Sequence, residues 1–279
     1  MRGGLKHKRY FAKGGKGRAK QWLLCLGAVF GGQKVGGEIE MDEKAKRKMI
    51  YNYFKPFPKW AVIMIIIGLP LLLAAGFGII LIGIGIVGLV LYNKGKPADR
   101  QMDEWLREDL VNLGKRALNK MNIDDPESIV YSVAITGPRL WDVAGANIFF
   151  KKGKDNILRF TPININIVNC LQNHLLAYTC ILDFTTGNPL NESTEEYFYK
   201  DIVSVSTRTE SRTVNSPKIG TIQMNEAETF TLTTSGGTSF SILLRDPTLI
   251  KKMGGGEIPV GRAEEAVQEI RKILRSKKI

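Results

Sequence analysis

The hydrophobic pattern of the chain is dominated by 33 consecutive uncharged residues, 60–92. A helix needs about 20 apolar residues to cross a bilayer, and two helices need about 40. Pro70 and the small-residue stretch AAGFG divide the run into arms 60–75 and 77–92, each roughly 24 Å long as a helix. One helix over the whole run would be about 50 Å long and would need extreme tilt. The pattern therefore predicts a transmembrane helical hairpin.

The charge on the two flanks of this run favours the same topology. Residues 1–59 contain 15 lysines and arginines against 4 acidic residues, whereas the residues after 92 are nearly balanced. Lys55 and Lys59 precede the run, and Lys94 and Lys96 follow it. The positive-inside rule then puts both flanks and both termini in the cytoplasm, with the hairpin in a cell inner membrane.

The basic N-terminal segment has two possible partners. Lysine and arginine beside a membrane segment attract the anionic head groups of the lipid bilayer, which is the partner we expect. Nucleic-acid binding by the Gly/Lys/Arg-rich first 20 residues is the alternative. It is disfavoured because no folded nucleic-acid module follows in the chain.

Five glycines give the predicted hairpin small-residue surfaces, which are candidates for membrane packing: Gly76, Gly78, Gly83, Gly85 and Gly88. In lipid, such surfaces let helices approach closely. They either pack the two arms of one hairpin together or join several molecules into a homo-oligomer, and both interpretations stay open. No ionisable residue lies inside the run, so the sequence offers no candidate for an ion relay or a transport path.

After the hairpin, the pattern predicts a linker and connecting helix over 93–125 and a β-rich cytosolic domain over 126–279. Apolar residues recur at helical spacing within 101–121 and again within a C-terminal helix over about 262–276. Between these helices, period-two segments separated by turn residues indicate antiparallel strands. The fold class is therefore an α+β membrane protein, a transmembrane hairpin plus an antiparallel β domain with a C-terminal helix.

Finer features are expected inside the β-rich domain. The turns KKGKDN and SGG mark two hairpins, and the segment EEYFYKDIVSVSTRT, 195–209, is strand-rich. Residues 246–261, with three consecutive glycines, are expected to form a loop.

The β-rich domain resembles a bacterial pleckstrin-homology-like domain. The resemblance covers about 145–276 and rests on the strand YFYKDIVSVS, the hairpin FTLTTSGGTSFSI and the helix AEEAVQEIRKILR. It implies an antiparallel PH-like β domain closed by a C-terminal helix, and a binding or scaffolding role without catalysis. A shared fold does not by itself fix a function.

The candidate ligand-binding residues are three lysines on the KKGKDN turn, Lys151, Lys152 and Lys154. Three cations on a tight turn can bind phosphate head groups or an acidic partner. In pleckstrin-homology-like domains an early basic hairpin often binds lipid phosphates, which the resemblance implies for this turn. A solvated loop is the alternative.

The sequence shows no catalytic, metal-binding or cofactor motif. His7 and His174 stand alone, and no Ser-His-Asp, HExxH or P-loop pattern is present. Glu192, in NESTEE, reads as part of a solvated strand edge rather than a cation site. The three cysteines lack metal-ligand spacing and are expected to be reduced thiols in a cytosolic domain.

The leading hypothesis is a non-enzymatic, membrane-anchored scaffold or sensor that presents a PH-like domain to an unknown protein partner or ligand. The alternative is a membrane-perturbing or pore-forming effector that acts through an oligomerising, Gly-rich hairpin. An enzyme of a class that the sequence motifs do not identify would need a polar pocket, and the sequence contains no pattern that indicates one.

Overall fold

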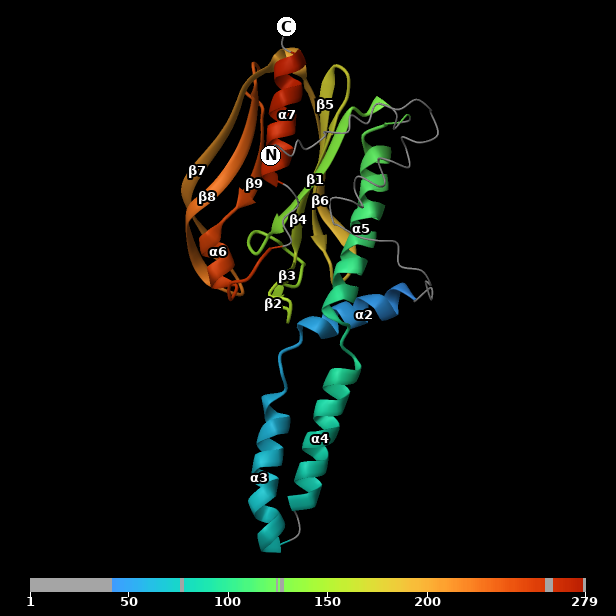
Figure 1. The fold of residues 1–279 in the computed structure, drawn as a ribbon, viewed down its shortest axis with the longest axis vertical. Coiled ribbons are helices and arrows are strands. Elements are labelled where there is room, and N and C mark those ends of the chain that lie inside the picture. Colours follow the sequence, from blue (N-terminus) through green and yellow to red (C-terminus); the bar gives the residue numbers. More distant parts are fainter. Residues whose placement is uncertain (1–41, 76–77, 124, 126–127, 259–262, 278–279) are drawn as a thin grey trace, which may run out of the picture.

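A computed structural model describes residues 42–75, 78–123, 125, 128–258 and 263–277. The molecule is elongated (Figure 1): two apolar helices project from one end, and a β-rich body with its covering helices forms the rest. The N-terminal segment with its apolar stretch 22–30, and Gly76 in the predicted turn, lie outside the described residues.

Four helices precede the sheets, and their bounds follow the sequence signals closely: α2 (Glu43–Phe54), α3 (Lys59–Ala75), α4 (Gly78–Lys94) and α5 (Asp99–Lys120). The carboxylate of Asp42 accepts a hydrogen bond from the Lys44 amide at the start of α2, and Pro56 and Pro58 follow its end. Pro70 lies inside α3 without ending it, as membrane helices tolerate. The prediction of two arms rather than one continuous helix agrees with these bounds.

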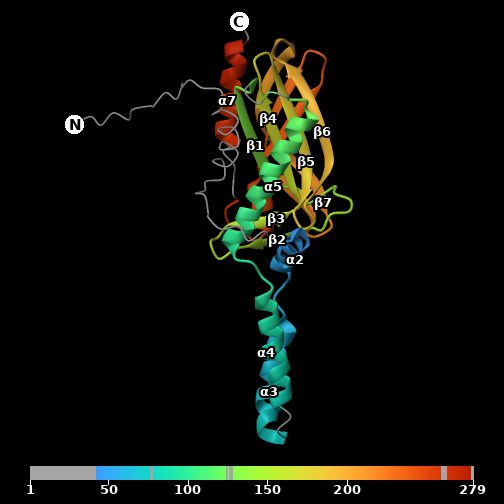
Figure 2. The same ribbon diagram turned by 90° about the vertical axis from the view of Figure 1, so that its right-hand side faces the viewer.

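The helices α3 and α4 lie side by side (Figure 1) and overlap in the view turned by 90° (Figure 2). Many of their apolar side chains are exposed. By length and composition, one helical stretch of the described chain is apolar enough to cross a membrane, Gly78–Lys120, which includes α4 and α5. A second qualifies when α2 and α3, bent by 60°, count as one span. Only 11% of the apolar window in the first stretch is buried, whereas a core helix of a soluble protein would be mostly buried.

The first sheet has four antiparallel strands in the order β1-β4-β5-β6. Its strands are β1 (Tyr131–Pro138), β4 (Ile163–Cys170), β5 (His174–Asp183) and β6 (Asn188–Phe198). Between β1 and β4, the chain forms a separate hairpin of β2 (Phe149–Lys152) and β3 (Leu158–Thr161). The strands β4 and β5 are buried on both faces, which places them at the centre of the body.

The second sheet is a three-stranded antiparallel meander, β7 (Ile202–Ser216), β8 (Gly220–Thr234) and β9 (Ser239–Arg245). The segment expected to be strand over 195–209 is broken by a short 3-10 turn, η2 (Tyr199–Asp201), which passes the chain from one sheet to the other. The C-terminal helix is α7 (Ala263–Lys277). The fold is thus α+β with antiparallel sheets and a C-terminal helix, as predicted.

One expectation about the body was wrong. Residues 246–261, expected to be a loop, include the helix α6 (Pro247–Lys252). Asp246 caps α6 through a hydrogen bond from the Leu249 amide of 2.7 Å, and Pro247 occupies the first turn, where its missing N–H costs nothing. Six residues are too few for hydrophobic periodicity to identify a helix.

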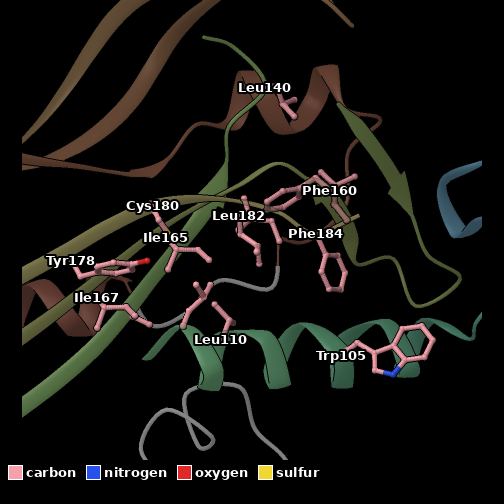
Figure 3. Close-up of a cluster of buried hydrophobic side chains, with 14 of the residues drawn as sticks. Trp105, Leu110, Leu140, Phe160, Ile165, Ile167, Tyr178, Cys180, Leu182 and Phe184 are labelled. Carbon is pink, nitrogen blue, oxygen red and sulfur yellow. The ribbon is translucent and has the colours of Figure 1, made fainter. Parts of the chain in front are cut away.

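Two hydrophobic cores lie on opposite faces of the first sheet. Ile165, Ile167 and Tyr178 point to α5 and pack with its Leu110, as Figure 3 shows. The alternate residues, such as Val168, point the other way and pack with α7 and the second sheet. Because side chains alternate across a strand, the same two central strands serve both cores.

Candidate functional site

The β2–β3 hairpin carries the predicted lysines and lies against the C-terminal end of α2, close to where α3 and α4 join the body (Figure 1). The Phe149 ring stacks on Phe54 at 5.9 Å and meets Tyr51 edge-on at 5.5 Å. These aromatic contacts fix the hairpin on α2. We call this junction of α2, the hairpin and the first turn of α5 the neck.

Lys151 is not a free cation but part of the neck. Its ammonium group donates to the Tyr53 carbonyl at 3.3 Å and lies 4.0 Å from the centre of the Tyr53 ring. Lys96 donates to the carbonyls of Lys55, at 2.9 Å, and Tyr53, at 3.5 Å. Helix C-termini have unpaired carbonyls and a partial negative charge, so the two lysines stabilise the end of α2.

The surroundings of the Lys151 and Lys96 side chains disfavour their protonated, charged forms. Burial lowers the pKa of Lys151, and the nearby Lys96 lowers it further. Burial and the charge of Lys55 likewise lower the pKa of Lys96. For both groups, burial is the larger cause of the lowered pKa and the neighbouring cation the smaller one.

Lys152 and Lys154, by contrast, present their side chains to solvent. In the part of the chain that the structure describes, neither ammonium group has a carboxylate partner, although the Lys154 amide donates to Asp99 at 2.8 Å. Of the three predicted ligand-binding lysines, these two are available to a ligand, and Lys151 is held by Tyr53. Ligand binding at this turn stays a prediction.

The hairpin is anchored by Arg159, a buried arginine of β3 that sequence reasoning missed. Its guanidinium group donates to Asp103 at 2.8 and 2.6 Å and to Asp155 at 3.0 and 2.6 Å. It also lies 3.9 Å from Asp99, which accepts a 2.7 Å bond from the Tyr53 hydroxyl. Burial alone would lower the pKa of Arg159, but the bonded carboxylates raise it instead. One arginine thus ties β3, its turn and α5 together.

Gly153 in the turn leaves room for this arrangement. A Cβ built on it would lie 2.8 Å from the Asp99 carboxylate and would also contact Arg159 and Asp155. Any larger residue would therefore displace part of the carboxylate cluster. The Lys-Lys-Gly pattern identified the turn from the sequence, but not this close approach.

A second ion-pair cluster joins the other end of α2 to α5. Lys46, only 4% exposed, donates to Asp109 at 3.0 Å and to Glu108 at 2.8 Å. Arg47 binds both oxygens of Asp109, at 2.6 and 2.8 Å. Burial opposes the charge of Arg47, but Asp109 and Glu43 raise its pKa. The helix α2 is therefore bonded to α5 at both ends.

Glu192 does not lie on a solvated strand edge, as the sequence suggested. It accepts hydrogen bonds from Arg116 at 2.8 and 2.6 Å and from the Tyr178 hydroxyl at 2.7 Å, and it lies 3.0 Å from Lys120. The bonds from Arg116 come first among the causes that lower the pKa of Glu192 to about 2. This side chain links β6 to the end of α5.

The glycines of α3 and α4 do not share one role. A Cβ on Gly85 would lie 2.6 Å from the Ala61 carbonyl, and one on Gly88 would lie 2.6 Å from the Trp60 ring. A Cβ on Gly78 would lie even closer to the Gly68 carbonyl. A Cβ on Gly83, however, would have nothing within 4 Å. Three of the predicted packing glycines therefore face the neighbouring helix, and Gly83 faces away from it.

No metal-ligand cluster accompanies these groups in the described ranges. Among those residues, no set of three or more His, Cys, Asp or Glu could hold a metal ion. His174 lies at the start of β5, 3.5 Å from Glu196 and beside Phe198. The absence of an enzymatic activity and of a cofactor stays a prediction.

Comparison of the chain with protein-family models, with curated proteins and with solved structures finds no match in any of the three.

Proposed function

We propose that this protein is a non-enzymatic scaffold or sensor, anchored in a membrane by a transmembrane hairpin of α3 and α4, with a PH-like binding domain on the cytosolic side. The observation that carries the proposal is the exposed apolar surface of the helix pair. Ile79 is 67% exposed and Leu91 is 66% exposed, and other large apolar side chains of α3 and α4 are exposed as well. Soluble monomers rarely expose so large a contiguous apolar surface.

The dimensions and charges of the pair support a membrane anchor. Each helix has 17 residues, or about 25 Å, which suits a slightly thinned hydrocarbon core. Lys59 begins α3 and Lys94 ends α4, so both cationic ends lie at the neck. Because both helices join the body at this end, an inserted hairpin would leave α2 and both sheets on the same side.

The succession of two antiparallel sheets followed by α7 supports the PH-like part of the proposal. In this arrangement, Lys152 and Lys154 occupy the end of the body that adjoins the helix pair of α3 and α4, where anionic head groups would lie. Attraction of about 1 kcal/mol per exposed cation near such a surface would hold the β2–β3 turn at the bilayer.

Topology is tested by labelling single cysteines with a membrane-impermeant maleimide, in intact vesicles of both orientations. Asn93, exposed at the end of α4, and Ile79, exposed near its start, are each changed to Cys in a Cys25→Ser background. The proposal expects labelling of the two positions from opposite sides, with Asn93→Cys on the side of the β domain. Labelling of both from the same side would refute a full crossing.

Head-group contact is tested by hydrogen exchange of residues 149–158 in nanodiscs with and without anionic lipid. Anionic lipid is expected to slow exchange in the unmodified chain but not in a Lys152→Gln/Lys154→Gln variant. The matched control replaces Lys200 and Lys272, exposed lysines of η2 and α7, and should behave like the unmodified chain. Equal protection in all three chains would exclude the two turn lysines as the contact.

The membrane-perturbing alternative rests on Gly83, whose open surface could meet a second molecule. If pore formation is the function, purified protein should release dye from vesicles, and Gly83→Leu should stop the release. The scaffold proposal expects no release from either chain.

A further inference from the structure

A cavity of about 150 Å³ lies in the β-rich body, lined by residues from the end of β1, from β7 and β9, and from α6. It is separate from the lysines of the β2–β3 turn. Its walls combine apolar residues such as Leu249 and Ile258 with the charged groups of Arg139, Arg212, Arg245 and Asp246. Arg245 is 60% exposed and paired with Glu228 at 2.7 Å, whereas Arg139, Arg212 and Asp246 each have a buried polar atom without a partner among the described residues.

Two of these groups share one buried aromatic ring. Trp141 is only 3% exposed, and the guanidinium carbons of Arg139 and Arg212 lie 5.1 and 5.4 Å from its ring centre. Both distances permit a cation–π contact. Burial lowers the pKa of Arg139; Asp142, 3.6 Å away, opposes this effect, and the charge of Arg212 lowers the pKa further. Two like charges therefore lie against the same ring in the wall of the cavity.

Three polar atoms of this wall are buried without a hydrogen-bond partner among the described residues: Arg139 Nε, Arg212 Nε and Asp246 Oδ2. Buried polar groups of native proteins are almost always paired, and an unpaired one is costly. Asp246 is 3% exposed and uses its other oxygen to cap α6. Two cationic side chains and one anionic side chain with unpaired polar atoms therefore line the cavity.

From this set of groups we infer that the cavity binds a phosphate group. Two guanidinium groups supply charge-assisted donors to its oxygens. A hydrogen phosphate or protonated monoester also carries one O–H, which the free oxygen of Asp246 accepts. Sulfate, which has no proton at neutral pH, would instead place an unprotonated oxygen against that carboxylate. Because ligand sites for larger molecules occupy roughly 300–1,000 Å³, the cavity takes free phosphate or only the phosphate group of a larger molecule.

The test is calorimetric titration of the full chain in detergent with inorganic phosphate and with sulfate, followed in parallel by tryptophan fluorescence. Phosphate is expected to bind saturably and sulfate is not. Arg139→Gln and Arg212→Gln should each weaken phosphate binding by about tenfold or more, as loss of one charge-assisted bond predicts. Arg208→Gln, an exposed residue of the same strand as Arg212, is the matched control and should leave binding unchanged.

The specificity arm uses Asp246→Asn, which keeps the oxygen that caps α6 and replaces the free oxygen with a donor. This variant should bind sulfate as tightly as phosphate. A second arm replaces free phosphate with phosphatidic acid in nanodiscs, and binding that appears only there and is lost in Arg139→Gln identifies a lipid head group as the source. Thermal unfolding checks that each variant is folded.

The inference is overturned if the unmodified chain binds neither free phosphate nor phosphatidic acid, or if folded Arg139→Gln and Arg212→Gln variants bind as well as the control. It does not depend on membrane insertion or on the turn lysines. Phosphate titration in detergent therefore tests the cavity, and cysteine labelling in vesicles tests the membrane anchor. A negative result in one experiment leaves the other claim standing.

Discussion

Replacement of Arg159 by methionine is the sharpest test of the neck. Methionine fills a similar volume but leaves the carboxylates of Asp99, Asp103 and Asp155 together without their shared cation. Arg159 is 6% exposed and makes four hydrogen bonds to two of these groups. The substitution should therefore release the β2–β3 hairpin from α5.

The magnitude follows from burial. Removal of one partner from a fully buried ion pair costs about 3–5 kcal/mol. The carboxylates here are 22% to 37% exposed, so water screens part of their repulsion and the lower end applies. We expect Arg159→Met to lower the free energy of unfolding by about 3 kcal/mol, on the order of a 100-fold change in the folding equilibrium.

The assay is urea unfolding of the full chain in detergent, followed by tryptophan fluorescence between pH 7 and pH 4. Hydrogen bonds from Arg159 hold the pKa of Asp155 below its usual value, which is about 3.9 in an unfolded chain. A lowered pKa stabilises the fold above the unfolded value, and the effect is lost as the pH falls through the folded value. In Arg159→Met, mutual repulsion raises the carboxylate pKa values, so acid should relieve the strain.

The difference in unfolding free energy between the two chains should therefore be largest at pH 7 and should shrink towards pH 4. The control is Arg100→Met, because Arg100 is 77% exposed in its pair with Glu104, and it should cost less than about 0.5 kcal/mol. A difference that is constant across this pH range, or a cost equal to that of the control, would refute the electrostatic account.

Three further outcomes are expected. Glu192→Gln should destabilise the body at pH 7 but not near pH 2. The hydrogen bonds from Arg116 hold the pKa of Glu192 at about 2, against about 4.3 in an unfolded chain, so this side chain stabilises the fold only while it is ionised. Acid titration of unfolding, followed by circular dichroism, measures this loss. Gly85→Leu should lower the thermal midpoint of the helix pair in detergent far more than Gly83→Leu, since only the first contacts α3, and the reverse order would show that the pair packs differently. Cys170, whose pKa burial raises to about 12, should resist maleimide until urea unfolds the chain, and rapid labelling of its native peptide by mass spectrometry would contradict that burial.

The long elements of this fold were predictable from the sequence because each carries many repeats of its period. The arms 60–75 and 77–92, the connecting helix and the C-terminal helix all lie within a few residues of their expected bounds. The break at Tyr199 was not, because its buried ring and its hydroxyl bond to the Leu171 carbonyl depend on a distant segment. A local pattern contains no information about such a contact.

The candidate site was predictable only in part, for the same reason. Lys152 and Lys154 stand out as a cluster within one turn. Arg159 looks like an ordinary strand residue, although its partner Asp103 is 56 positions away. Lys46 looks like one of several helix-surface lysines, yet it pairs with a carboxylate 63 positions away. The groups that hold the neck together become visible only when α2, α5 and the hairpin are placed in space.

These distant pairs hold the β-rich body at a fixed orientation to the helix pair of α3 and α4. The helix α2 precedes α3, and α5 follows α4 after only four residues, so both segments that leave the helix pair continue into helices that are bonded to each other. Asp109 fixes one end of α2, and the Tyr53–Asp99 bond with Lys151 fixes the other. Breaking a buried ion pair is costly. Rotation of the β-rich body about the helix pair of α3 and α4 would require the loss of several of these contacts between α2, α5 and the β2–β3 hairpin. Under the proposed anchoring, the exposed lysines of the turn are consequently held towards the head groups.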